Sequence, residues 1–274
     1  MPYDAAITRN EPTAFLFLID QSGSMQDALP SGRSKAEQLA DVLNSSITTL
    51  IQRCTKANGI RDYFEIGAIG YGVGIKNVFQ GSLSGQILNP ISMFIQNTLR
   101  VEQRARNGGT GNMSEEKVPF PVWYEPAASG GTPMCAALIA AAREIGRFCE
   151  AHMPSYPPTI LHITDGEAGD GDPEEIAKTI MQLNTNNGEI LLFTLHLSDG
   201  SPDAIEFPDS ESSLPNDYAK MLFRSSSPLP AHLQFAAAEK GFKVSDKSRG
   251  FMFNADATQI MDFFDIGTRA AQMR

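Results

Sequence analysis

The sequence predicts a doubly wound α/β domain: a mostly parallel central sheet, helices on both faces and one antiparallel edge strand. Short apolar runs alternate with longer segments of helical periodicity along most of the 274 residues, as in successive βαβ units. Several of these runs are continuously apolar, which is typical of strands buried on both faces. Oxygen-bearing side chains follow two of the runs directly, at the edge where open α/β sheets bind ligands.

The first part of the chain supplies a strand, a long helix and a second strand. Ala14–Asp20 is too short for a membrane span and reads as a buried parallel strand. Ser34 and Glu37 form a capping box that begins a helix running to about residue 56. Phe64–Tyr71 is the next strand, and Val73–Gln80 pairs with it antiparallel through a glycine turn, which gives the edge strand.

An insert is expected at about residues 81–131, where the periodicity weakens. Within it, Pro90–Arg100 is a candidate short helix, and the glycine-rich stretch 107–112 is a candidate flexible loop. Trp123 and Tyr124 lie between prolines in a stretch without an assigned element. They form either a local core under the insert or an exposed rim that contacts a partner.

The second part of the chain continues the alternation. A helix opens at Thr132-Pro133, because proline suits the first helical position. Another helix begins after Asp172-Pro173, where a cap precedes two acids, and ends at Asn187-Gly188. The remaining predicted strands are Thr159–Thr164, Glu189–Leu197 and Phe251–Asn254, and the remaining predicted helices are Leu214–Phe223, Pro230–Lys240 and Ala257–Ala270.

Composition excludes several classes of function. The hydrophobic content of 42% and charged content of 20% are ordinary for a globular protein with a sizeable core. The net charge of −10, with no basic run, argues against nucleic-acid binding. No apolar run approaches the roughly 18 residues of a spanning helix, so no membrane association is expected.

The cysteines and the N-terminal residues bear on the cellular compartment in which the protein is expected. The N-terminal residues lack the basic and then apolar pattern of a signal peptide. Cys54, Cys135 and Cys149 are odd in number and widely spaced, which favours buried free thiols over disulfides. We therefore expect a cytoplasmic protein.

Three loops carry the chemistry-bearing residues. The first holds Asp20, Ser22 and Ser24 after a strand, the second holds Thr132 before a helix, and the third holds Asp165 after a strand. If both strands are parallel and central, the three loops meet at one sheet edge. Two carboxylates and three hydroxyls suit a hard divalent cation such as Mg²⁺ or Mn²⁺.

Each feature has a plainer alternative. Taken singly, the serines are consistent with a turn, and Thr132 with a helix cap. The acidic stretch with Glu167, Asp170 and Asp172 is either a second cation site or a solvated loop with a helix cap. The glycines of the 70–74 segment form either an incomplete phosphate-binding fingerprint or, with no helix following, a strand turn.

The combination resembles the metal-ion-dependent adhesion site (MIDAS) of the von Willebrand factor A (VWA) domain family. The family pattern is D-x-S-x-S, then a T, then a D followed by G. All its positions are matched here, by Asp20, Ser22, Ser24, Thr132 and Asp165. The resemblance covers residues 1–274 in element order, as a single VWA domain with the insert at about 81–131.

The resemblance also implies roles for the site residues. Ser22 and Ser24 would bind the metal directly, and Thr132 directly or through water. Asp20 and Asp165 would act mainly through water and through hydrogen bonds to the ligands. The cation would then stay electrophilic and accept a Glu or Asp carboxylate of a partner protein.

The function implied is a non-enzymatic, metal-dependent protein-binding module. Cytoplasmic bacterial members of the family work beside MoxR-type AAA+ ATPases, or beside kinase and phosphatase partners in stress-response or tellurium-resistance-like systems. Relatives couple the metal site to movement of the C-terminal helix, here about 257–270. The alternatives are a Mg²⁺-dependent phosphatase with Asp20 as nucleophile and a structural subunit whose metal site is inactive. The phosphatase pattern needs a second acid two residues later, where this chain has Ser22.

Overall fold

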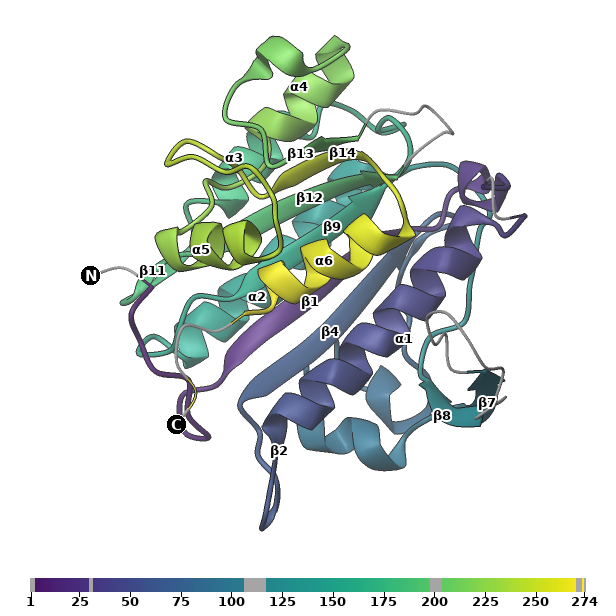
Figure 1. Ribbon diagram of the computed structural model, residues 1–274, viewed down its shortest axis with the longest axis vertical. Coiled ribbons are helices and arrows are strands. Elements are labelled where there is room, and N and C mark those ends of the chain that lie inside the picture. The colour runs from purple at the N-terminus through teal and green to yellow at the C-terminus, as the bar shows by residue number, and fades with distance from the viewer. Residues whose placement is uncertain (1–2, 30–31, 106–116, 198–203, 270–272, 274) are drawn as a thin grey trace.

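A computed structural model describes residues 3–29, 32–105, 117–197, 204–269 and 273. Its centre is an eight-stranded sheet in which the inner strands are parallel (Figure 1). Along the sheet the order is β13 (Ile205–Glu206), β14 (Phe251–Ala255), β12 (Leu191–Leu197), β9 (Thr159–Thr164), β1 (Thr13–Asp20), β4 (Phe64–Tyr71) and β5 (Ile75–Asn77), while β6 (Asn89–Pro90) pairs with β4 off this path. The predicted α/β fold class is confirmed.

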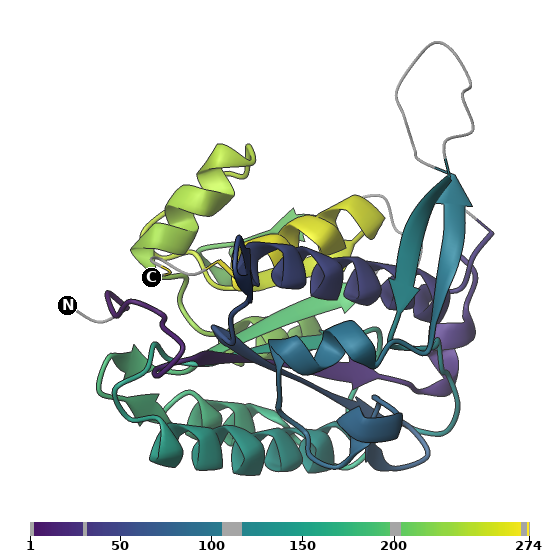
Figure 2. The same cartoon turned by 90° about the horizontal axis from the view of Figure 1, so that it is seen from below.

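Helices cover both faces of the sheet. One face carries α1 (Lys35–Cys54), α5 (Ala231–Glu239) and α6 (Ala257–Gly267), and the other carries α2 (Met134–Ala151) and α3 (Glu174–Ile180) (Figures 1 and 2). A further helix, α4 (Asp217–Arg224), packs near β14. The arrangement is the doubly wound one that the alternation of strands and helices predicts.

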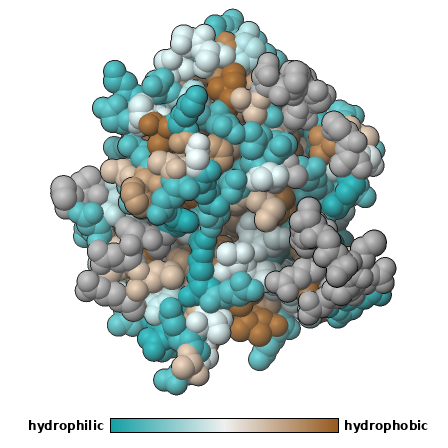
Figure 3. Space-filling view, in the orientation of Figure 1, coloured by the Kyte–Doolittle hydropathy of each residue, from teal (hydrophilic) through white to brown (hydrophobic). Residues whose placement is uncertain are grey.

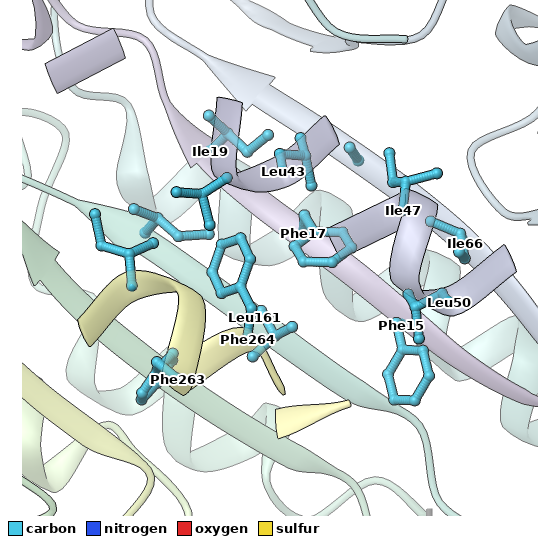
Figure 4. Packing of buried hydrophobic residues seen from close by; sticks show 14 of the residues in the cluster. Phe15, Phe17, Ile19, Leu43, Ile47, Leu50, Ile66, Leu161, Phe263 and Phe264 are labelled. Carbon is cyan, nitrogen blue, oxygen red and sulfur yellow. The ribbon is translucent and has the colours of Figure 1, made fainter. Parts of the chain in front are cut away.

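The central strand β1 separates two hydrophobic cores. Phe15, Phe17 and Ile19 belong to the cluster beneath α1 and α6 (Figure 4), whereas Leu16 and Leu18 belong to the cluster beneath α2. Side chains of a strand alternate between faces, so a continuously apolar strand fills both cores. This double burial fixes the position at which β1 delivers Asp20 to the edge of the sheet.

Most predicted elements are present, and several boundaries differ. Ser34 and Glu37 form the predicted capping box, but α1 ends at Cys54 because the following residues form the hairpin β2 (Thr55–Lys56) and β3 (Gly59–Ile60). Likewise α3 stops at Ile180, and the Asn- and Thr-rich segment after it forms β10 (Asn184–Thr185) and β11 (Gly188–Glu189). In both places hydrogen bonds of a hairpin replace the last predicted residues of a helix.

The sheet has more antiparallel strands than predicted. The expected edge strand is β5, which pairs antiparallel with β4. The structure adds β13 beside β14 and β6 beside β4, both antiparallel. These extra strands are two residues long, too short to show the alternation by which strands are recognised in a sequence.

The region at about 81–131 contains regular structure. It holds the 3₁₀ helices η2 (Gly81–Ser84) and η3 (Ile91–Gln96), then the antiparallel ribbon of β7 (Arg100–Ala105) and β8 (Lys117–Val122) (Figure 2). The short helix predicted over Pro90–Arg100 is thus present in part, and the predicted loop at 107–112 lies outside the described residues. The single-domain assignment of residues 1–274 stays a prediction.

The described part of the chain contains no helix that is long and apolar enough to cross a membrane. Hydrophilic side chains cover most of the face seen in Figure 3, with hydrophobic ones in separate small groups. Cys54, Cys135 and Cys149 are free and buried, as predicted.

Candidate functional site

The site begins with Asp20, which is fully buried at the carboxyl end of β1. Its Oδ1 accepts a hydrogen bond of 2.8 Å from the Ser22 amide, and its Oδ2 accepts one of 2.8 Å from Thr164 Oγ1. Burial raises the pKa of Asp20 and the negative charge of Asp165 adds to the rise, while the hydrogen bonds oppose it. The structure therefore places a poorly solvated carboxylate at the sheet edge.

Two serines link this loop to the neighbouring strand end. Ser22 Oγ lies 3.0 Å from Ser24 Oγ, and Ser24 Oγ donates to Asp165 Oδ1 at 2.8 Å. The side chain of Asp165, just beyond β9, is fully buried. The first and third predicted loops thus meet, because β1 and β9 are adjacent and parallel.

Thr132 brings the second loop to the same place. A Cβ atom built on Gly166 would lie 3.9 Å from both Ser24 Oγ and Thr132 Oγ1, so both hydroxyls border Gly166. The carbonyl of Thr132 accepts a hydrogen bond of 2.8 Å from the Gly169 amide. All five residues predicted as the site, Asp20, Ser22, Ser24, Thr132 and Asp165, lie on loops that meet at this edge.

Close backbone contacts hold the loops together. The Ser129 amide donates to the Gln21 carbonyl at 2.6 Å, and the Gly23 amide donates to the Gly130 carbonyl at 3.1 Å. A Cβ on Gly72 would lie 2.5 Å from the carbonyl oxygens of Gln21 and Ser129, so only glycine fits there. The turn after β4 therefore packs against both loops, and the 70–74 glycines are a strand turn.

Lys35 is a site residue that the sequence analysis missed. It is the first residue of α1, its side chain is 5% exposed, and its Nζ lies 2.8 Å from Asp165 Oδ2. Asp27 Oδ2 is 3.8 Å from the same nitrogen. One signal was available: a lysine in the first turn of a helix opposes the helix dipole and needs a nearby acid.

Tyr218 is a second residue that the sequence did not indicate. It reaches the third loop from α4, and its phenol donates to the carbonyl of Gly166. Burial raises the pKa of this phenol, so it stays protonated and remains a donor. No periodicity distinguishes such a tyrosine from the others on an amphipathic helix.

The acidic loop after β9 caps helices. Asp170 accepts hydrogen bonds from the amides of Cys135 and Ala136, at 3.0 and 2.9 Å, in the first turn of α2. Asp172 accepts one of 2.9 Å from the Glu174 amide at the start of α3. Of the two alternatives for this loop, the structure supports helix capping.

Of the two alternatives for Trp123 and Tyr124, the local core is confirmed and the exposed rim is wrong. Each is 2% exposed, and both belong to the core beneath α1. Trp123 Nε1 donates to the Phe94 carbonyl at 2.8 Å, and Gln21 Nε2 donates to the Tyr124 hydroxyl at 3.1 Å. The insert thus buries both side chains in this core, and Tyr124 contacts the first loop through Gln21.

The donor set suits a small divalent cation. Neighbouring ligands of an octahedral Mg²⁺ site stand about 3.0 Å apart, given metal–oxygen distances of about 2.1 Å. The 3.0 Å between the Ser22 and Ser24 hydroxyls and the 2.8 Å from Ser24 to Asp165 are close to that spacing. Among the described residues no group of three or more His, Cys, Asp or Glu side chains could hold a metal.

Comparison with known proteins gave matches among solved structures alone. No protein-family model matches the chain, and no curated protein matches it. The pilus adhesin SpaC from Lactobacillus rhamnosus GG aligns with 11% identity and a TM-score of 0.50, over 95% of this chain and 30% of that chain.

Two further structures align less closely in shape. A von Willebrand factor type A protein from Catenulispora acidiphila has 15% identity and a TM-score of 0.49, over 95% of this chain and 43% of that chain. The manganese-loaded TRAP protein of Plasmodium vivax has 16% identity and a TM-score of 0.38, over 70% of this chain and 59% of that chain. The chain thus spans between about a third and three fifths of these proteins, and the likeness to SpaC concerns the fold alone.

Proposed function

We propose that this chain is a VWA-type, metal-dependent protein-interaction module that binds a Glu or Asp side chain of a partner through a MIDAS-held divalent cation. One observation carries the proposal. The hydroxyls of Ser22 and Ser24 are spaced as neighbouring ligands of one ion would be, and Asp165 accepts a hydrogen bond from Ser24. The Thr132 hydroxyl borders Gly166, as the Ser24 hydroxyl does, and Asp20 accepts a hydrogen bond from the Ser22 amide.

The site residues would have two roles: some would bind the cation, and others orient the residues that bind it. Bound Mg²⁺ or Mn²⁺ would supply a Lewis acid with a coordination position open to an incoming oxygen. Ser22, Ser24 and Thr132 would hold it through neutral oxygens. Asp20 orients the first loop by accepting a hydrogen bond from the Ser22 amide, and Asp165 orients the Ser24 hydroxyl by accepting a hydrogen bond from it. Residues that hydrogen-bond to metal ligands in this way strongly affect the affinity for the metal.

The geometry favours docking over catalysis. A phosphatase would need Asp20 as an accessible nucleophile, but this carboxylate is fully buried and both its oxygens accept hydrogen bonds. The position two residues later, where such an enzyme has a general acid, is Ser22. We therefore propose that the chain is not an enzyme.

The partner must offer an acidic side chain. A carboxylate is the natural last ligand for a hard cation held by hydroxyls. By resemblance, a MoxR-type ATPase or a kinase or phosphatase partner in a cytoplasmic stress-response system is the partner class that we propose. Nucleic acid is disfavoured by the net charge of −10.

Affinity capture with and without metal tests the proposal. Three purified proteins are immobilised and incubated with cell extract in Mg²⁺ or in EDTA. They are the wild type, the Asp20→Ala variant and the control variant Asp246→Ala, in which a surface residue is changed. The proposal predicts a partner retained in Mg²⁺ by the wild type and by Asp246→Ala, and lost in EDTA or with Asp20→Ala. A partner retained under all conditions would contradict it, as would a phosphatase activity that Asp20→Ala abolishes.

A further inference from the structure

A buried ammonium group contacts the candidate metal site. The Nζ atom of Lys35 lies 2.8 Å from Asp165 Oδ2, while Asp165 Oδ1 accepts the Ser24 hydroxyl. The two side chains are 5% and 0% exposed. Lysine is rarely so buried unless it is paired, so this contact is built into the fold.

The location of Lys35 is unfavourable for the helix itself. It follows the N-cap Ser34 directly, in the turn where backbone amides already present positive charge. Its other acidic neighbour, Asp27, is 69% exposed and 3.8 Å away, which is a weak, screened partner. The contact that compensates for the burial of the ammonium is therefore the one with Asp165.

We propose that Lys35 sets the charge of the site so that a metal-loaded site requires an anionic ligand. The inference rests on the proposed function. The carboxylates of Asp20 and Asp165 together with the Lys35 ammonium leave one net negative charge. A divalent cation changes this to one net positive charge, and a partner carboxylate makes the site neutral. Without Lys35, the cation alone would neutralise the two carboxylates, and a partner carboxylate would add an uncompensated negative charge.

The proposal predicts opposite effects on two affinities. A positive charge beside the site opposes the divalent cation and attracts the carboxylate. Replacing Lys35 with an uncharged side chain of similar length should therefore strengthen Mg²⁺ binding and weaken carboxylate binding to the loaded site. A residue that merely positions Asp165 would weaken both affinities when replaced.

Calorimetric titration with Mg²⁺ measures the first affinity. The wild type is compared with Lys35→Met, which keeps the apolar stem, and with Lys35→Arg, which keeps the charge. We expect Mg²⁺ to bind Lys35→Met about tenfold more tightly or better, and Lys35→Arg to stay near the wild type. If Lys35→Met does not fold in metal-free buffer, Lys35→Gln refolded in millimolar Mg²⁺ replaces it.

Acetate serves as the probe for the second affinity. With Mn²⁺ in place of Mg²⁺, acetate bound to the site is detected by the paramagnetic broadening of its NMR signal. We expect acetate to bind the Mn²⁺-loaded wild type and Lys35→Arg, and to bind Lys35→Met about tenfold more weakly. Variant proteins are compared at metal saturation, so a change in metal affinity does not enter this result.

The outcomes separate this inference from the proposed function. Failure of the wild type to bind Mg²⁺ would overturn both. Mg²⁺ binding that is unchanged or weaker in Lys35→Met would overturn the role of Lys35 alone. The same conclusion would follow if Lys35→Arg behaved like Lys35→Met, because packing rather than charge would then explain the effect.

Discussion

Asp20 occupies a position in which its charge works against folding. The carboxylate is fully buried, and burial raises its pKa above that of the unfolded chain. The folded state consequently binds the Asp20 proton more tightly than the unfolded state does. The resulting penalty is absent at low pH and grows as the pH rises above the unfolded pKa.

Replacing Asp20 with Asn should therefore stabilise the metal-free protein at neutral pH. The amide oxygen can still accept the Ser22 amide, and Thr164 Oγ1 can donate to the Gly166 carbonyl instead, 3.0 Å away. We expect Asp20→Asn to have a higher thermal midpoint than the wild type in metal-free buffer at neutral pH. Asp20→Ala, which loses both hydrogen bonds, should lower the midpoint. A lower midpoint for Asp20→Asn would contradict the account.

His162 is a residue whose effect on stability depends on pH. It is buried in β9, its Nε2 lies 2.7 Å from the Tyr71 hydroxyl, and burial lowers its pKa to about 3. The unfolded chain takes up this proton near pH 6.5. The stability contributed by the neutral ring is thus complete above about pH 6.5 and is lost as the pH falls toward about 3.

His162→Gln should reduce this dependence on acidity. Glutamine keeps a polar partner for Tyr71 and removes the titration. Between about pH 6 and 4, the unfolding free energy of the wild type should fall more steeply than that of the variant, by up to about 1.4 kcal/mol per pH unit. Urea unfolding at several pH values measures the difference, and equal slopes would show that His162 does not titrate as described.

Among the elements, α2 and α3 begin with comparable caps but differ in their relation to the site. Asp170 accepts hydrogen bonds from two amides in the first turn of α2, the helix that begins two residues after Thr132. Asp172 accepts a hydrogen bond from the Glu174 amide of α3. Each cap contributes about 1 kcal/mol to stability. Only the α2 cap fixes the loop that carries a proposed metal ligand.

Removing the two caps should have separable effects. Asp170→Ala and Asp172→Ala should each lower the unfolding free energy by about 1 kcal/mol. Asp170→Ala should also weaken Mg²⁺ binding, because the Thr132 loop loses its anchor, whereas Asp172→Ala should leave it unchanged. Thermal unfolding and Mg²⁺ calorimetry measure both quantities, and equal Mg²⁺ affinities in the two variants would exclude a role for the α2 cap in the site.

The helix α6 is tied to its neighbours by a partly buried ionic network. Asp265 pairs with Arg53 of α1 and, at 3.0 Å, with Lys240. Asp217, whose side chain is fully exposed, instead pairs with Lys220 at 3.3 Å. Networks with several charges stabilise more than isolated exposed pairs do.

Asp265→Asn should therefore destabilise the fold by about 1 kcal/mol or more, whereas Asp217→Asn should change it little. The effect of Asp265→Asn should shrink as salt is added, because exposed parts of the network are screened. Denaturant unfolding at low and high ionic strength measures this contrast. Equal effects of the two substitutions would mean that the network does not hold α6.

At the scale of the whole molecule, the sequence predicted the parts with strong local signals. β1 is a nearly continuous apolar run and β9 is an apolar-rich one, and because they are parallel neighbours the loops after them converge. The ribbon of β7 and β8 was missed because Pro119 and Pro121 are unusual within a strand. They are tolerated because proline nitrogens at alternate positions can face away from the partner strand.

The missed site residues share a different cause. Lys35 and Tyr218 reach the site from elements distant in sequence, and their roles depend on how α1 and α4 pack against the sheet. A lysine in the first turn of a helix signals only that an acid is nearby, not which one, and a tyrosine within an amphipathic helix has no local pattern that distinguishes it. Long-range packing, rather than any motif, brings them to the carboxylates.

The central claim is that Ser22 and Ser24 hold a divalent cation at the edge of this sheet. Calorimetric titration of Mg²⁺ into the wild type, the Ser22→Ala/Ser24→Ala double variant and the exposed control Ser213→Ala tests it most directly. We expect saturable binding at one site in the wild type and in the control, and a loss of affinity of at least about 100-fold in the double variant. Absence of binding in the wild type, or equal affinity in the double variant, would contradict it.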